Sequence, residues 1–175
     1  AAAVVIGPGL GQEAGAERLL DLVLQEAEKL PELPVVIDAD GLNLLAKKRL
    51  YSTLGRQYVL TPHLREMSRL SGKSVQEIAD DMTSAVMGQQ AGATIVLKDA
   101  RTLVSDGDWL YINLSGNSAL STGGSGDVLS GMIGGLLAQG CTQRTAATLA
   151  VYMHGLTAEQ YCESALPHCM LARDI

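Results

Sequence analysis

A glycine-rich stretch with a single acid holds the residue types best suited to chemistry in this chain. Residues 115–140 read SGNSALSTGGSGDVLSGMIGGLLAQG, and Asp127 is the only charged side chain among them. Glycines let backbone N–H groups converge on one point, because a chain without Cβ atoms turns tightly and approaches a ligand closely. The uncharged run after Asp127 predicts a helix that starts near Gly126 and adds its positive end to the site. The expected anion pocket consists of Gly123, Gly124, Ser125 and Gly126.

The local sequence leaves two explanations of Asp127 open. A carboxylate beside an anion pocket suits a general base, which takes a proton from a hydroxyl while the N–H groups hold the phosphoryl group in transit. Alternatively, Asp127 is a helix cap after a flexible loop, with glycines that allow close helix packing. The stretch is not a Walker A loop, because the Gly-Lys-Ser/Thr ending is missing.

The composition of the 175-residue chain indicates one folded domain with an acidic balance. Hydrophobic residues make up 47% and charged residues 18%, as in ordinary globular proteins. A net charge of −6 gives no field that would attract nucleic acid or an anionic membrane. Three cysteines without C-x-x-C spacing argue against a disulfide framework and a zinc site. We therefore expect a cytoplasmic protein that binds neither nucleic acid nor membranes.

Short apolar runs alternate with longer amphipathic segments along the chain. The expected strands are residues 2–6, 35–37, 58–60 and 93–97, followed by a hairpin of 102–105 and 109–112. The expected helices are residues 12–30, 40–48, 64–70, 74–90, the segment after Gly126, and 143–164. Asp40 is the expected N-cap of the second helix. Ser74 is the expected N-cap of the fourth, where Glu77 completes a capping box. This alternation predicts an α/β fold, a mostly parallel sheet with helices on both faces.

Polar and glycine- or proline-rich segments follow four of the expected strands. These segments are residues 7–11, 38–43, 61–66 and 98–102. In open parallel sheets, ligands bind beyond the carboxyl ends of the strands. We therefore expect the four segments to meet the glycine stretch at one rim, and this convergence favours the enzymatic explanation of Asp127.

Five segments together resemble the ADP/ATP-dependent NAD(P)H-hydrate dehydratase family. In order, they are VIGPGLG, VIDADGLNLLA, LTPHLREMSRL, VLKDART and GNSALSTGGSGDVLSGMIGGLLAQG, within about residues 4–158. The resemblance implies a ribokinase-like, carbohydrate-kinase-like fold: a three-layer α/β/α sandwich that forms a single domain over residues 1–175. It also implies an activity, the nucleotide-dependent conversion of hydrated NADH or NADPH back to the coenzyme. Phosphorylation of the ring hydroxyl would make a good leaving group, and phosphate would then be eliminated.

The resemblance also implies roles for individual residues. Asp127 would be the catalytic base, and the anion pocket would stabilise the moving phosphoryl group. The hydrated dinucleotide would be contacted by Gly9, Gly11, His63 and Asp127. The nucleotide, ADP or ATP, would be held by Lys98, Asp99, Ala100, Arg101, Thr102, Asn117 and Gly126. Glu66 would order Mg²⁺ through water, and the protein would form a homo-oligomer.

Several of these residues have plain structural explanations as well. His63 could cap a helix, Glu66 could be a solvated helix residue, and Lys98 could be a surface lysine. Asp38 and Asp40 are expected to be caps and turn formers. His154 falls on the apolar face of the last helix, which predicts a core histidine with satisfied hydrogen bonds.

The chain departs from the family pattern in three places. It has TPHLRE where TPHPGE is usual, and Lys98-Asp99-Ala100 where Lys-Gly-Ala is usual, so a carboxylate lies near the expected nucleotide. The family's first strands are absent, and we expect an N-terminally truncated domain with a more open substrate pocket.

Two alternatives to the dehydratase stay open. One is a ribokinase-like kinase that phosphorylates a hydroxymethyl group on a small heterocycle with the same Asp127 and glycine loop. The other is a non-catalytic nucleotide-binding module. A dinucleotide-dependent dehydrogenase is not favoured, because GPGLG lacks the G-x-G-x-x-G spacing.

Overall fold

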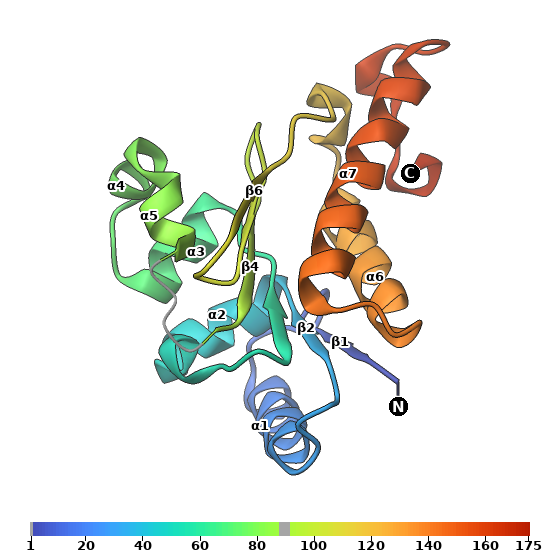
Figure 1. Cartoon of the computed structure of the whole chain (residues 1–175). Helices are drawn as coiled ribbons and strands as arrows, with labels where there is room; N and C mark the ends of the chain where they lie inside the picture. The colour runs from blue at the N-terminus through green and yellow to red at the C-terminus, as the bar shows by residue number, and fades with distance from the viewer. Residues whose placement is uncertain (1, 88–91) are drawn as a thin grey trace.

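The computed structural model of the protein describes residues 2–87 and 92–175, which include a six-stranded mixed sheet (Figure 1). Four neighbouring strands are parallel: β1 (Val4–Ile6), β2 (Val35–Ile37), β3 (Tyr58–Leu60) and β4 (Thr94–Leu97). An antiparallel hairpin of β5 (Leu103–Ser105) and β6 (Leu110–Ile112) continues the sheet beyond β4. The predicted α/β fold with a mostly parallel sheet is confirmed.

The spatial order of the strands equals their order in the chain, and this decides which face each helix covers. Parallel crossovers are right-handed, so a sheet that grows in one direction places its crossover helices on one face. These helices are α1 (Ala14–Lys29), α2 (Ala39–Lys48), α3 (Leu64–Ser71), α4 (Val75–Asp80) and α5 (Met82–Met87). The opposite face is covered by α6 (Ser125–Ala138) and α7 (Gln143–Cys162), which follow the hairpin (Figure 1). The result is the expected three-layer sandwich.

Alternating residues of the strands pack into two separate hydrophobic cores, one on each face of the sheet. Val35 and Ile37 pack with α1 to α5, whereas Val36 between them packs with α6 and α7. This period of two follows from the pleat of the strand. The chain contains no Phe, so both cores consist mainly of Leu, Ile, Val, Ala and Met. Each fully buried Leu or Ile contributes roughly 1.5–3 kcal/mol.

Two local predictions were wrong, and both errors concern helix boundaries. The segment expected to be one helix from Ser74 breaks between α4 and α5, because Asp81 has φ −143° and leaves the helical region. Residues 88–90 of that segment lie outside the described residues. The Ser74–Glu77 capping box is confirmed. The N-cap of α2 is Asp38 and not Asp40, since the Asp38 carboxylate accepts the Ala39 N–H at 2.8 Å.

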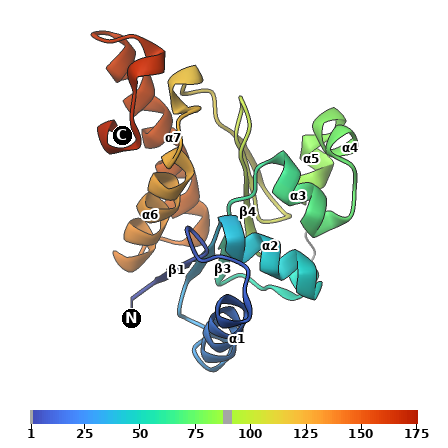
Figure 2. The ribbon, with the colours of Figure 1, turned by 180° about the vertical axis from the view of Figure 1, so that it is seen from behind.

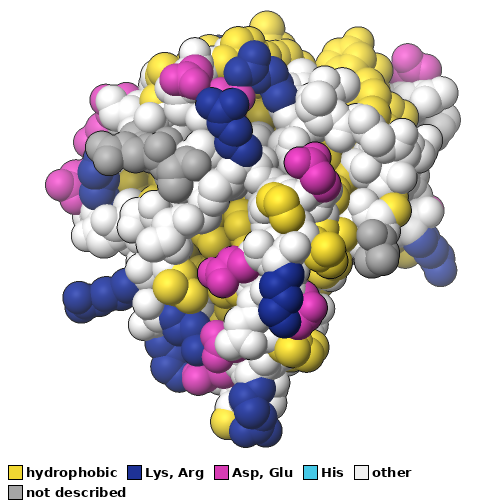
Figure 3. Space-filling model, turned by 60° about the horizontal axis from the view of Figure 1, so that its bottom comes forward, with side chains coloured by type: hydrophobic (Ala, Val, Ile, Leu, Met, Phe, Trp, Pro, Cys, Tyr) yellow, Lys and Arg dark blue, Asp and Glu magenta, His cyan; other side chains and the backbone are white. Residues whose placement is uncertain are grey.

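Four short 3₁₀ turns and a set of surface ion pairs complete the described structure. The turns are η1 (Tyr51–Thr53), η2 (Ser118–Leu120), η3 (Pro167–Cys169) and η4 (Ala172–Asp174). Lys47 pairs with Glu17 and Lys48 with Asp21, which links α2 to α1. At the end of the molecule that carries α1, acidic and basic side chains are interspersed (Figure 3). Among the described residues, no helix is long and apolar enough to cross a membrane.

Candidate functional site

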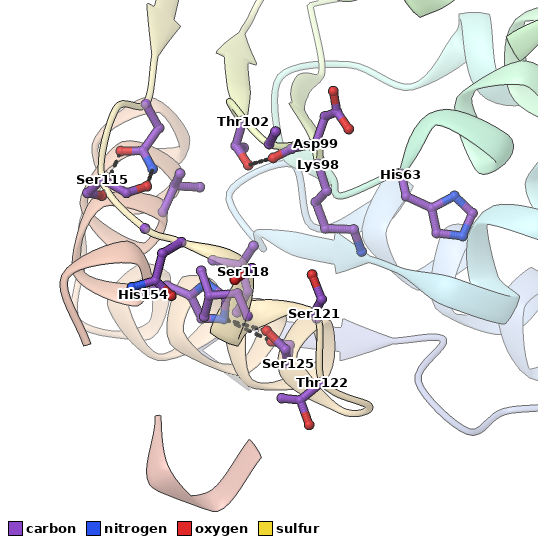
Figure 4. A pocket seen from close by; sticks show the side chains of 18 residues that line it. His63, Lys98, Asp99, Thr102, Ser115, Ser118, Ser121, Thr122, Ser125 and His154 are labelled. Atoms are coloured by element: carbon purple, nitrogen blue, oxygen red, sulfur yellow. Dashed lines mark hydrogen bonds between the residues drawn. The ribbon is translucent and has the colours of Figure 1, made fainter. Parts of the chain in front are cut away.

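A cavity of about 700 Å³ opens at the rim where the parallel strands end. Its first wall is the end of β3 and β4, where the backbone N–H of Lys98 bonds to Pro62 O at 2.8 Å and brings His63 beside Lys98. Its second wall is the loop from Asn113 to Thr122. Its third wall is the start of α6 with the middle of α7, including Ser125 and His154 (Figure 4). The volume lies in the range of pockets for small molecules and cofactors.

The glycine loop turns sharply before α6. Gly124 is the N-cap residue, with φ +86°, and no side chain caps the helix. This left-handed conformation favours glycine, because a Cβ atom raises its energy. The Ser125 N–H donates to Thr122 O at 3.3 Å. No side chain caps the N–H groups that follow it in the first turn, and these stay available to an outside acceptor at the positive end of the helix dipole. The predicted start of the helix at the end of the glycine loop is confirmed.

The structure brings part of the predicted anion pocket to the cavity. Ser125 and Gly126 line it, whereas Gly123 and Gly124 are exposed next to it and outside its lining. Asp127 lies in the first turn of α6 and is exposed, also outside the lining. Its carboxylate is therefore open to solvent and adjacent in sequence to the cavity wall.

An ion pair lies beneath the first turn of α6. Lys98 Nζ is 2.8 Å from Asp38 Oδ1, and the Asp38 side chain is only 2% exposed. Ser130 Oγ donates to Asp38 Oδ2 at 2.6 Å. A Cβ atom on Gly126 would lie 3.4 Å from Lys98 Nζ, so the missing side chain lets the ammonium approach the helix start. Lys98 points from the end of β4 toward the glycine loop (Figure 4).

The remaining predicted residues divide between the cavity and its surroundings. Asp99, Ala100, Thr102 and Asn117 line the cavity, and Arg101 is exposed outside the lining. Gly9 and Gly11 lie in the turn after β1, at the same rim but outside the cavity. Figure 2 shows this turn from behind, beside the start of α2. The Gly11 N–H donates to Asp40 Oδ2 at 3.0 Å, so Asp40 stabilises the turn.

His63 and Glu66 form the start of α3. His63 Nδ1 accepts the N–H groups of Arg65 and Glu66, each at 3.1 Å, and Glu66 Oε2 accepts the His63 N–H at 2.8 Å. The helix-cap explanation of His63 is therefore confirmed, although the residue also lines the cavity. Glu66 is buried and shares in this cap. Among the described residues, no group of three or more His, Cys, Asp or Glu is arranged to hold a metal ion.

Helix α7 holds the loop that forms the second wall through Gly155, Ala158 and Glu159, three residues for which the sequence predicts no functional role. Glu159 Oε1 accepts the Gly116 N–H at 2.8 Å, and Asn117 Nδ2 donates to Ala158 O at 3.1 Å. At Gly155 the loop crosses the helix so closely that a Cβ atom would lie 2.2 Å from Ser115 Oγ. In the sequence, only the glycine at position 155 indicates that the loop and the helix approach each other so closely.

His154 on α7 contacts the glycine loop. Its Nε2 lies 3.1 Å from Ser125 Oγ and 3.0 Å from Ser125 O. The prediction of a buried, satisfied histidine is confirmed. Its partner is Ser125 at the start of α6, which the apolar pattern could not reveal. Burial lowers the pKa of His154 below its ordinary value, and the nearby Lys98 charge adds to this effect.

Comparisons with known proteins agree with this geometry. The profile of the NAD(P)H-hydrate dehydratase (Carb_kinase) family matches residues 1–175. An ADP-dependent (S)-NAD(P)H-hydrate dehydratase of Neisseria meningitidis is 44% identical over 167 residues, which cover 92% of this chain and 55% of that protein. The chain therefore spans little more than half the length of this curated relative.

Solved structures show the same architecture. The ADP/ATP-dependent NAD(P)H-hydrate dehydratase of Bacillus subtilis, co-crystallized with ATP/Mg²⁺, matches with a TM-score of 0.82 and 33% identity, over 98% of this chain and 60% of that one. A hydroxyethylthiazole kinase of Pyrococcus horikoshii matches with a TM-score of 0.77 at 23% identity, over 96% of this chain and 67% of that one, and shares the fold. By its sequence and its architecture, the chain belongs to the NAD(P)H-hydrate dehydratase family of the ribokinase-like superfamily.

Proposed function

We propose that the protein uses ADP or ATP to dehydrate hydrated NADH or NADPH and so restores the coenzyme. One observation carries this proposal: an exposed carboxylate, Asp127, directly follows the part of the glycine loop that lines a cavity with Lys98. A helix start without a side-chain cap and a lysine suit nucleotide phosphates, and an adjacent carboxylate suits the deprotonation of a hydroxyl.

In the proposed mechanism, Asp127 accepts the proton of the ring hydroxyl. The hydroxyl oxygen then forms a bond to the terminal phosphorus, and the bond from that phosphorus to the leaving nucleotide breaks. The Gly126 N–H, together with the Lys98 ammonium, stabilises the charge on the transferring group. The ring nitrogen then donates its electron pair, the C–O bond breaks with release of phosphate, and loss of a proton from the adjacent ring carbon restores the double bond.

The two substrates would occupy different parts of the rim. The cavity, with Lys98, Thr102 and Asn117 in its walls, suits the nucleotide. The hydrated dinucleotide would lie outside it, on the part of the rim with Gly9, Gly11 and Asp127. This arrangement would place Asp127 between the ring hydroxyl and the nucleotide's terminal phosphate.

Magnesium is a further part of the proposal. The described residues include no group of three or more His, Cys, Asp or Glu side chains that could hold a metal ion, and the buried acids Asp38 and Glu66 already accept backbone N–H groups. Mg²⁺ is commonly held by phosphate oxygens and water with few protein carboxylates. The ion would therefore arrive with the nucleotide and neutralise phosphate charge, and we assign it no protein ligand.

The decisive experiment is incubation of the protein with hydrated NADH, Mg²⁺ and either ADP or ATP. We expect the absorbance of NADH to appear together with an equal amount of inorganic phosphate, and neither product without nucleotide. A stable phosphomonoester formed from a hydroxymethyl heterocycle, without NADH formation, would identify the kinase alternative. Nucleotide binding with no turnover of any of these substrates would identify the non-catalytic module.

Two expectations about the protein in its cell accompany this proposal. The free cysteines Cys141, Cys162 and Cys169 support a cytoplasmic, reducing location. The family resemblance implies a homo-oligomer, and sedimentation velocity of the purified protein would test it.

A further inference from the structure

The ring of His154 contacts Ser125 through a single nitrogen. Nε2 lies 3.0 Å from the carbonyl oxygen and 3.1 Å from the hydroxyl oxygen of Ser125. Both residues are buried, with 7% and 5% of their surface exposed, and both line the cavity. Figure 4 shows the ring and the Ser125 side chain facing each other across the start of α6.

These two distances show which nitrogen of the imidazole ring carries the proton. A carbonyl oxygen carries no hydrogen, so a nitrogen at 3.0 Å from it must donate. If Nε2 had no proton, its lone pair would face the lone pairs of Ser125 O. His154 is therefore protonated on Nε2, and this N–H is shared between the Ser125 carbonyl and hydroxyl oxygens. Because burial lowers the pKa of His154, the ring is neutral near pH 7.

The shared hydrogen bond has two consequences at the cavity wall. Ser125 Oγ accepts from the ring, so its own hydrogen is left for an acceptor in the cavity. The Ser125 carbonyl belongs to the same peptide unit as the Gly126 N–H. A hydrogen bond donated to that carbonyl polarises the peptide and strengthens the N–H as a donor, because hydrogen bonds in a chain reinforce one another.

We propose that His154 is a positioning residue that aims the Ser125 hydroxyl and strengthens the Gly126 N–H toward a phosphate group of the bound nucleotide. The inference rests on the proposed function only in naming the nucleotide as the ligand. It assigns His154 no contact with substrate. Its effect is confined to the phosphate end of the ligand.

The first test compares the binding of ADP and adenosine by calorimetry. In His154→Leu, which removes the ring N–H, we expect ADP to bind about tenfold more weakly than to wild type, because the Ser125 hydroxyl is no longer aimed at the charged phosphate and the Gly126 N–H is no longer strengthened. Adenosine has no phosphate, so its affinity should stay within about twofold of wild type. His154→Gln offers an amide N–H at similar reach and should restore most of the ADP affinity.

The matched control is Leu137→Ala, near the end of α6 and buried at 3% exposure in the core shared with α7. It should lower the melting temperature and leave the ratio of ADP to adenosine affinity unchanged. If His154→Leu weakens both ligands equally, or neither, His154 has only a structural role and the inference is wrong. Should His154→Leu fail to fold, His154→Phe, which keeps a ring and lacks the N–H, is measured in its place and must weaken ADP selectively.

The second test observes the proton directly. Nitrogen NMR of ¹⁵N-histidine-labelled protein distinguishes protonated from unprotonated ring nitrogens, and His154→Gln identifies the signals of His154 by their loss. We expect a protonated Nε2 and an unprotonated Nδ1. A neutral ring with the proton on Nδ1 would overturn the inference. Neither test needs NADH formation: selective ADP weakening without any dehydratase activity would refute the proposed function and leave the inference standing.

Discussion

Asp38 and Asp127 have different roles at this site because one is buried and the other is exposed. Asp38 is 2% exposed and bonded to Lys98, Ser130 and its neighbour's N–H, so its oxygens are occupied and it positions other groups. Asp127 is exposed in the first turn of α6. A general base needs an accessible lone pair, and of the two acids Asp127 is the better candidate.

At the scale of a residue, we expect Asp127→Asn to abolish turnover and leave nucleotide binding nearly intact. The amide cannot accept the hydroxyl proton, and loss of a general base typically lowers kcat by about 10²–10⁴-fold. The backbone N–H groups that hold phosphate are unchanged. NADH formation and ADP calorimetry measure the two effects separately. Asp80→Asn, an exposed acid at the end of α4, is the control, and activity of Asp127→Asn within a few-fold of wild type would count against the assignment.

Helix α6 begins where glycine makes a backbone turn that other residues rarely adopt. Gly124 has φ +86°, and a Cβ atom there would lie 3.1 Å from the Cβ of Ala172 in η4. The C-terminal turn therefore packs against the glycine loop, and the loop has little room to adjust. Gly131, one of the helical glycines of α6, has nothing within 4 Å of its Cβ position.

At the scale of an element, we expect Gly124→Val to eliminate turnover and lower stability. A β-branched residue is a pronounced outlier at positive φ, and the left-handed conformation costs about 1–2 kcal/mol, so the N–H groups of the loop should lose their common direction. Gly131→Ala should instead raise stability by about 0.5–1 kcal/mol without loss of activity. Urea unfolding and NADH formation would check both variants. Full activity in Gly124→Val would show that the loop geometry is not required.

The three layers of the molecule are joined at the rim by a few polar contacts. Asp38 directly follows β2 and is the N-cap of α2 on one face, Ser130 belongs to α6 on the other face, and Lys98 directly follows β4. Thr61 after β3 approaches Ser130 with an oxygen–oxygen distance of 3.4 Å. These contacts hold both helix layers and three strand ends in a fixed relation, so the cavity depends on the whole sandwich.

At the scale of the whole molecule, we expect Asp38→Asn to lower the free energy of unfolding by about 2–3 kcal/mol, because the Lys98 ammonium loses its partner. The value lies below that of a fully buried pair, since Lys98 keeps 21% exposure. Asp40→Asn, two residues away and not bonded to Lys98, is the control and should change stability much less. Equal losses in the two variants, measured by urea unfolding, would show that the ion pair does not stabilise the fold.

Much of the architecture could be predicted from the sequence, because it depends on local patterns. Apolar triplets such as Val35–Ile37, amphipathic helices and the glycine loop before α6 are each visible within a few residues. Boundary errors arose where competing local signals were close together. Asp38 and Asp40 are both good N-caps by type, but the Asp38 carboxylate accepts the Ala39 N–H whereas the Asp40 carboxylate accepts from Gly11 and Gln12 in the turn after β1.

The sequence by itself determined the mostly parallel sheet with helices on both faces and the rim to which the polar loops converge, because periodicity follows from short-range chemistry. The family resemblance, and not periodicity, implied that Lys98 and Gly126 belong to the nucleotide site. Only the tertiary structure decided the partners. Asp38 and Lys98 are 60 residues apart in the chain, and Ser125 and His154 are 29 apart. Such pairs form when the sheet aligns its strand ends and α7 packs against α6, and no local pattern records which buried polar groups will then meet.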